Sequence, residues 1–152
     1  MKEPHVPMEQ LEVYRRYVDI ADGVWSAVSS WPALARDTMG KQLICAIDSV
    51  GANLVEGDGR QGTADAVHFF VIARASVREA RYWLDRAVAR SVIPADDGAS
   101  KIKAIEAATQ LLNNLISYRR RQANGNTVRE DGSSYDACAS GPEEDESRAP
   151  DS

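Results

Sequence analysis

Hydrophobic residues recur along the chain at alternating steps of three and four, the spacing of one face of an α-helix. The spacing predicts helices over about residues 8–30, 36–56, 63–92 and 96–122, and no strand-like alternation competes with it. Short connections between long helices favour antiparallel neighbours. The chain is therefore predicted to be all-α, an antiparallel up-down-up-down four-helix bundle.

Each predicted helix has an apolar stripe that we expect to face the core. In the first helix the expected stripe is Leu11, Tyr14, Val18, Ala21, Trp25 and Val28. In the second it is Leu43, Ile47, Val50 and Leu54. The third alternates small and large residues, a pattern that lets neighbouring helices approach closely: Ala66, Phe70, Ala73, Val77, Ala80, Leu84 and Ala87. The fourth has Ile102, Ile105, Leu112 and Ile116.

Prolines and glycines predict where these helices end. Pro32 ends the first helix and Pro94 follows the third. Three glycines within residues 57–62 predict a sharp reversal that uses backbone angles open to glycine. Thr63 is then the expected N-cap of the third helix, and Asn124-Gly125 closes the fourth.

Polar residues run beside two of these apolar stripes, at the same helical spacing. In the second helix this polar stripe is Gln42, Ala46, Ser49, Asn53, Glu56 and Arg60. In the third helix Phe69, Ile72, Ser76, Glu79 and Trp83 mix polar with apolar groups. Such stripes indicate a buried polar network, a subunit contact or a ligand-facing surface.

We expect these groups to form a structural polar network of Gln42, Ser49, Asn53, Glu56, Arg60, Arg74, Ser76 and Glu79. An arginine with two carboxylates could instead orient a substrate. The structural interpretation is favoured because buried charges persist in proteins when they are paired, and such pairs can fix one arrangement of helices or subunits.

Charge divides the chain into two parts. Residues 1–122 carry 16 Lys and Arg against 15 Asp and Glu, whereas residues 123–152 carry 2 against 8. The second part is also poor in apolar residues, so it cannot offset its ordering entropy. We therefore predict a four-helix bundle over residues 1–122 and a disordered acidic tail over residues 123–152.

Catalytic and metal-binding patterns are poorly matched. The histidines are His5 and His68, and the one Asp-x-x-His pair, Asp65 with His68, falls short of a di-metal site in a bundle. Ser49 and Ser76 have no histidine base near them in the sequence. The glycine-rich stretch follows a helix rather than a strand, which favours a turn over a phosphate loop, although a helix N-terminus there could hold an anion. We expect no catalytic residues, metal or cofactor.

The chain has no recognisable targeting or membrane segment. Residues 1–11 lack the apolar core of a signal peptide, and no stretch is long and apolar enough to cross a bilayer. Cys45 and Cys138 are best explained as a packing residue and a tail thiol. We expect a cytoplasmic protein.

Arginines provide a second functional clue. They cluster on the third helix and at the end of the fourth: Arg74, Arg78, Arg81, Arg86, Arg90, Arg119, Arg120 and Arg121. Such patches can bind phosphate backbones. A solvated face is equally consistent with them, since arginines near a helix C-terminus also interact well with its dipole.

Two motifs resemble a known family. Gln42, Ala46, Ser49, Asn53, Glu56-Gly57 and Arg60 form the first, and Ala73-Arg74, Ser76 and Glu79 form the second. Their order and spacing resemble the four-helix-bundle family that includes proteins encoded in intervening sequences of bacterial large-subunit ribosomal RNA genes. The accessory variability determinants of diversity-generating retroelements belong to the same family.

This resemblance implies a homopentamer without enzymatic activity; the retroelement members bind a reverse transcriptase and its RNA through a basic surface. Here Ile44-Cys45 replaces a basic pair and Ala75 replaces a glycine, which weakens the nucleic-acid interpretation. We expect a self-associating helical-bundle scaffold or binding protein. The alternative is an accessory protein that binds RNA, a reverse transcriptase, or both.

Overall fold

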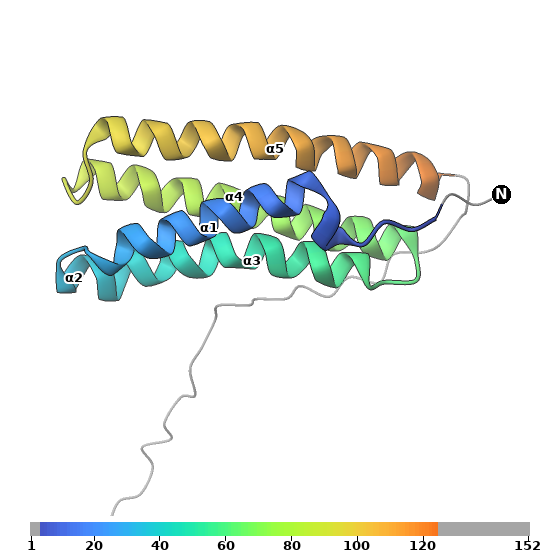
Figure 1. The fold of residues 1–152 in the computed structure, drawn as a ribbon, viewed down its shortest axis with the longest axis horizontal. Coiled ribbons are helices and arrows are strands. Elements are labelled where there is room, and N and C mark those ends of the chain that lie inside the picture. Colours follow the sequence, from blue (N-terminus) through green and yellow to red (C-terminus); the bar gives the residue numbers. More distant parts are fainter. Residues whose placement is uncertain (1–3, 125–152) are drawn as a thin grey trace, which may run out of the picture.

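The computed structural model describes residues 4–124, which form an antiparallel helical bundle (Figure 1). In chain order its elements are η1 (Met8–Gln10), α1 (Glu12–Ser29), α2 (Ala33–Ala35), η2 (Arg36–Gly40), α3 (Lys41–Asp58), α4 (Thr63–Ala89) and α5 (Ala95–Ala123). The predicted four-helix bundle is confirmed, and residues 4–124 contain no strand. The part of the predicted tail from residue 125 onward lies outside the described residues.

The four long helices pack as a closed ring around one core. Both α1 and α4 contact α3 and α5, so each helix has two neighbours and faces the fourth across the core. The expected core stripes of α3 and α4 are confirmed, and Leu54, Phe70 and Leu84 are fully buried. Small alanines alternate with these large side chains on α4, which allows the close packing that the sequence predicted.

The expected stripe of α1 is wrong in its rotation. The buried residues of α1 are Val13, Tyr17, Ala21, Val24 and Val28, whereas Trp25 is 61% exposed. The expected stripe and the buried stripe overlap on this helix, because Ala21 and Val28 belong to both. The stripe that faces the core includes Tyr17, whose hydroxyl lies 3.0 Å from Thr109 Oγ1 on α5.

Burial raises the pKa of Tyr17 to about 12, and the hydrogen bond to Thr109 opposes that rise.

The helical run that contains α3 begins before the predicted Arg36. It starts with α2, passes through η2 and continues into α3. Five residues of η2 form a π-helix, in which the N–H of Lys41 bonds the carbonyl of Arg36 five residues earlier. A π-turn holds one residue more than an α-turn and often lies at a functional site.

The α3–α4 turn differs from the glycine-based prediction. Among residues 4–124 no glycine has a positive φ. Gly57 is required instead for close approach: a Cβ there would lie 2.8 Å from Phe70 Cε1 and 3.0 Å from the carbonyl oxygen of Ala66. The predicted N-cap is also wrong, since Gly62 takes that place without a side-chain cap and Thr63 is the first residue of α4.

The left-handed residue is found at the other end of α4. Ser91 has φ 58° and follows the C-cap, Arg90. The N–H of Val92 bonds the carbonyl of Ala87 at 2.9 Å, and the N–H of Ser91 bonds that of Val88 at 3.0 Å. This is the Schellman arrangement, with serine where glycine is usual.

Candidate functional site

The polar stripes of α3 and α4 meet where these two helices pack together. Ser49 Oγ on α3 lies 3.0 Å from Ser76 Oγ on α4. Asn53 Nδ2 donates to Ser49 Oγ at 3.1 Å and to the Ser49 carbonyl at 2.8 Å. Asn53 is only 8% exposed and is the one buried polar residue in the described part of the chain. These three residues form the serine–asparagine cluster.

A second polar group closes the α3–α4 turn. Arg60 bonds Glu56 Oε1 one helical turn earlier and lies 3.7 Å from Asp65 Oδ2 on α4. Its guanidinium stacks over the Phe69 ring, 4.4 Å from the centroid. Because all three charged side chains are more than a third exposed, solvent screens these pairs and each adds little stability.

The remaining members of the expected network lie apart from these two groups. Arg74 turns toward α5, where its Nη1 donates to Asn113 Oδ1 at 3.2 Å. Glu79 accepts a bond of 3.4 Å from the indole N–H of Trp83. Gln42 is exposed at the start of α3. The structure therefore divides the predicted network into a serine–asparagine cluster, a turn group and separate local contacts.

We define the α3/α4 face as Ser49, Ala52, Glu56, Ala75, Ser76 and Glu79. By helical spacing these residues lie on the outer side of the two helices, and each is exposed or half-buried. They are small or hydrogen-bonding side chains. The titratable groups of this face are the exposed carboxylates of Glu56 and Glu79.

Metal ligands do not gather in the described residues. Among residues 4–124 no group of three or more His, Cys, Asp and Glu side chains could hold a metal ion. His68 packs edge-on against Phe69, with ring centroids 5.9 Å apart. In the same part of the chain, no helix has the length and hydrophobicity needed to cross a bilayer.

The predicted arginine patch is partly occupied by internal contacts. Arg81 bonds Glu106 at 2.9 Å, Arg119 lies 3.7 Å from Asp58, and Arg74 bonds Asn113. The other predicted arginines form no ion pair within residues 4–124: Arg78, Arg86, Arg90, Arg120 and Arg121. The basic surface available to a partner is therefore smaller than the sequence suggests.

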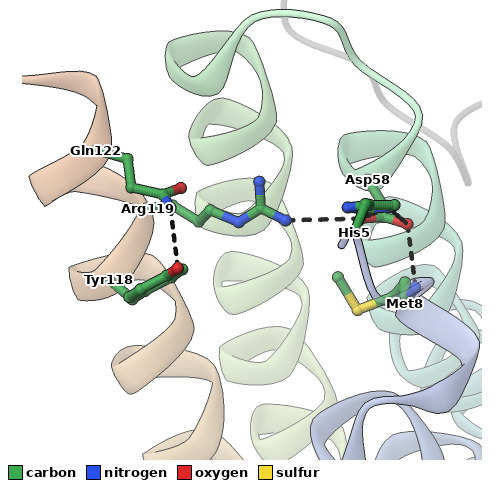
Figure 2. A network of polar contacts seen from close by, with 6 residues as sticks. All are labelled: His5, Met8, Asp58, Tyr118, Arg119 and Gln122. Carbon is green, nitrogen blue, oxygen red and sulfur yellow. Dashed lines mark hydrogen bonds and ion pairs between the residues drawn. The ribbon is translucent and has the colours of Figure 1, made fainter. Parts of the chain in front are cut away.

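A polar cluster that the sequence did not predict surrounds Asp58, the last residue of α3 (Figure 2). Its Oδ2 accepts a 3.0 Å bond from the backbone N–H of Met8, and His5 Nε2 lies 3.3 Å away. Its Oδ1 is buried without a hydrogen bond among the described residues, 3.7 Å from Arg119 on α5. Asp58 is 11% and Arg119 21% exposed. This cluster joins the N-terminal segment to the ends of α3 and α5.

Near the same end of α5, Gln122 Nε2 donates to the Tyr118 hydroxyl at 2.9 Å (Figure 2). That contact spans one helical turn, so spacing could have indicated it. No spacing signal could have found the contacts of Asp58, because its partners lie about 50 residues or more away in the sequence.

One further carboxylate is perturbed. Partial burial, followed by repulsion from Asp22 on α1, raises the pKa of Asp48 on α3. Asp48 lies outside the α3/α4 face. Burial of the Asp48 carboxyl is the larger cause and the Asp22 carboxylate adds to it, so the shift does not indicate a paired acid and base.

Comparisons with known proteins agree with the helical fold. A solved structure of a protein with unknown function from the S23 ribosomal protein family of Bacteroides thetaiotaomicron has a TM-score of 0.62 and 23% identity. The alignment covers 68% of this chain and 97% of that one, and it shows a shared fold. No curated protein matches the sequence. The family model described as 23S rRNA-intervening sequence protein matches residues 9–114, well over half of the chain. The chain therefore belongs to the 23S rRNA-intervening sequence protein family.

Proposed function

We propose that this protein is a non-enzymatic, self-associating scaffold of the cytoplasm, assembled as a homopentamer through the α3/α4 face. The observation that carries the proposal is the serine–asparagine cluster. Ser49 and Ser76, which belong to this face, are hydrogen-bonded between the two helices, and the buried Asn53 donates to Ser49. Such a face lets another helix approach closely and finds partners for its polar groups.

The proposal also accounts for the four residues that this face shares with the family motifs: Ser49, Glu56, Ser76 and Glu79. In a monomer, Glu56 and Glu79 would need only solvent, since both are exposed. Against a second subunit, the same carboxylates and hydroxyls would select one register, because mismatched polar groups would be buried without partners.

Bulk added to the face tests this function. Ala52→Arg places a long charged side chain on an exposed position of α3, so the fold should be retained while assembly is blocked. Light scattering should give about five times the 16.6 kDa chain mass for the native protein and a lower mass for the variant. The matched control is Ala107→Arg, at an exposed position of α5, which should keep the native mass. A monomeric native protein, or identical masses for both variants, would contradict the proposal.

Nucleic-acid binding, alone or with a reverse transcriptase, is the second candidate. Adjacent Arg120 and Arg121 favour it, since both are exposed at the end of α5 and form no ion pair within residues 4–124. Titration of single-stranded RNA at several salt concentrations tests it. Arg120→Gln with Arg121→Gln should lower the slope of log affinity against log salt by roughly 1.4, about 0.7 for each phosphate that the variant no longer neutralises. No binding would contradict this candidate, and binding with an unchanged slope would show that Arg120 and Arg121 do not contact the RNA.

A further inference from the structure

A cavity of about 640 Å³ opens at the end of the bundle formed by α2, η2 and the α4–α5 connection. These segments lie at the same end of the molecule, opposite the end where α5 finishes (Figure 1). The cavity is lined by Pro32, Leu34, Ala35, Thr38, Met39, Arg90, Ser91 and Val92. Its volume is within the range of sites that hold small molecules, about 300–1,000 Å³. It shares no residue with the α3/α4 face.

The lining is mostly apolar, and one wall is unusually accessible. Leu34 is 80% exposed, more than any other large hydrophobic residue described in the chain. Met39 is buried and Val92 half-buried in the same lining. Leu34 and Ala35 belong to the helical run that the η2 π-turn interrupts, so the π-turn sets how this wall is rotated toward α4.

Arg90 is the only charged residue of the lining. It is exposed and forms no ion pair within residues 4–124, whereas nearby Arg36 is paired with Asp37 at 3.0 Å. The carbonyls of Ala87 and Val88 already accept backbone bonds from the turn. Arg90 therefore adds to the lining of an apolar cavity a cation that has no ion-pair partner within residues 4–124.

We propose that this cavity binds a small amphiphilic carboxylate, with its alkyl chain against Leu34, Met39 and Val92 and its carboxylate on Arg90. Charge complementarity carries the choice of head group: a guanidinium binds a carboxylate through two parallel N–H donors. The apolar lining favours an alkyl chain as the rest of the ligand, because alkyl groups gain affinity in proportion to the area that they bury.

Calorimetric titration of the full-length protein with hexanoate, octanoate, decanoate and dodecanoate, each below its micelle concentration, provides the first test. Affinity should rise roughly fourfold for each methylene that the cavity buries, and each ligand should saturate at a fixed ratio to the chain. Affinity that does not depend on chain length would overturn the proposal. So would the lack of saturable binding.

Two variants locate the site without disturbing the core. Arg90→Gln should weaken decanoate binding by roughly fivefold, the upper range for an exposed ion pair, and leave binding of decanol unchanged. Leu34→Ala should weaken both ligands several-fold, because it removes apolar contact but not charge. The matched control is Arg86→Gln, one helical turn earlier on α4 and outside the lining, which should bind decanoate like the native protein. Equal affinity in all of these proteins would overturn the proposal.

Assembly offers a different occupant for the cavity. If a second copy of the chain filled it, native protein would bind no decanoate, and Leu34→Ala would lower the mass measured by light scattering. That pair of results would overturn the carboxylate site. Saturable decanoate binding to an oligomer of unchanged mass would support it. Because the cavity and the α3/α4 face share no residue, either proposal can fail alone.

Discussion

The two ends of the bundle are built in opposite ways. At the end where α3 and α5 finish, Asp58 joins the N-terminal segment to Arg119, and the Asp58 carboxylate is nearly buried from solvent. At the other end, the α2 and η2 wall leaves an apolar cavity open and Leu34 exposed. One end uses charge to close the core, and the other leaves hydrophobic surface exposed.

This contrast teaches where stability and recognition lie in a small bundle. A buried charge with few partners is costly to disturb, so the Asp58 end is expected to be sensitive to substitution. The exposed Leu34 side chain contributes little to folding, so this position of the cavity wall can vary while the core remains intact. The predictions below test this contrast in order of decreasing effect.

The largest effect is expected at Asp58. Asp58→Ala removes a charged acceptor from the Met8 N–H and leaves Arg119 half-buried without its partner, which should cost about 3 kcal/mol of unfolding free energy. The matched control is Asp65→Ala, whose carboxylate is also 3.7 Å from an arginine but is 51% exposed. That variant should lose less than about 1 kcal/mol. Equal losses in urea unfolding would remove the distinction between buried and exposed pairs.

The next effect concerns Tyr17, which joins α1 to the middle of α5 and belongs to neither end. Its pKa is raised from 10.0 to about 12 in the folded protein, so the folded state retains the proton over that range of pH while the unfolded state loses it. The contribution of Tyr17 protonation to the free energy of unfolding is therefore complete below pH 10, and it is lost as pH rises through about 12. The loss should approach about 2.7 kcal/mol.

Urea unfolding at about pH 9 and about pH 12 measures that loss. Tyr17→Phe should remove this part of the alkaline destabilisation, because phenylalanine has no proton to lose. A variant that keeps the full native pH dependence would show that another group is responsible.

Gly57→Ala should destabilise the Asp58 end by about 2 kcal/mol, since the new methyl group would contact the Phe70 ring and the Ala66 carbonyl at or below 3.0 Å. The control is Gly23→Ala on α1, where a Cβ would have no heavy atom within 4 Å. That change should stabilise the protein by about 0.5–1 kcal/mol through helix propensity. Thermal unfolding distinguishes these two variants. A Gly57→Ala protein more stable than the native one would contradict the close packing of Gly57 against Phe70 and Ala66.

The smallest effect is expected at the cavity end. Ser91→Gly should raise the unfolding free energy by about 1 kcal/mol, because the left-handed backbone at φ 58° strains serine but not glycine. Ser91→Ala serves as the comparison and should bring no gain, since its Cβ meets the same strain. If chemical denaturation shows no difference between the two variants, the backbone at Ser91 is not strained.

The sequence predicted the bundle well where one apolar phase dominated. On α3 and α4 the polar stripes leave a single apolar face, so the side of each helix that faces the core was predicted correctly. On α1 both Val24 and Trp25 fit a helical stripe, and the choice depended on packing of Tyr17 against α5. Rotation of such a helix is a tertiary property that spacing along one helix does not determine.

The site was predictable as a set of residues but not as a set of partners. Ser49 and Ser76 were identified by spacing, yet their contact depends on the stagger of α3 against α4. Arg74 was predicted to belong to the same polar network as Glu79, and it bonds Asn113 on α5. Leu34 and Arg90 lie 56 positions apart, so only the folded chain brings them to the same cavity.

The η2 π-turn has a consequence for how this gene can change. Because it accommodates one residue more than an α-turn, losing a single codon within residues 36–40 could restore a regular helix without breaking the reading frame. The core residues of α3 would stay in place, while Leu34 would rotate by about 100° around the helix axis. Deletion of one codon at this position is therefore expected to reshape the cavity wall.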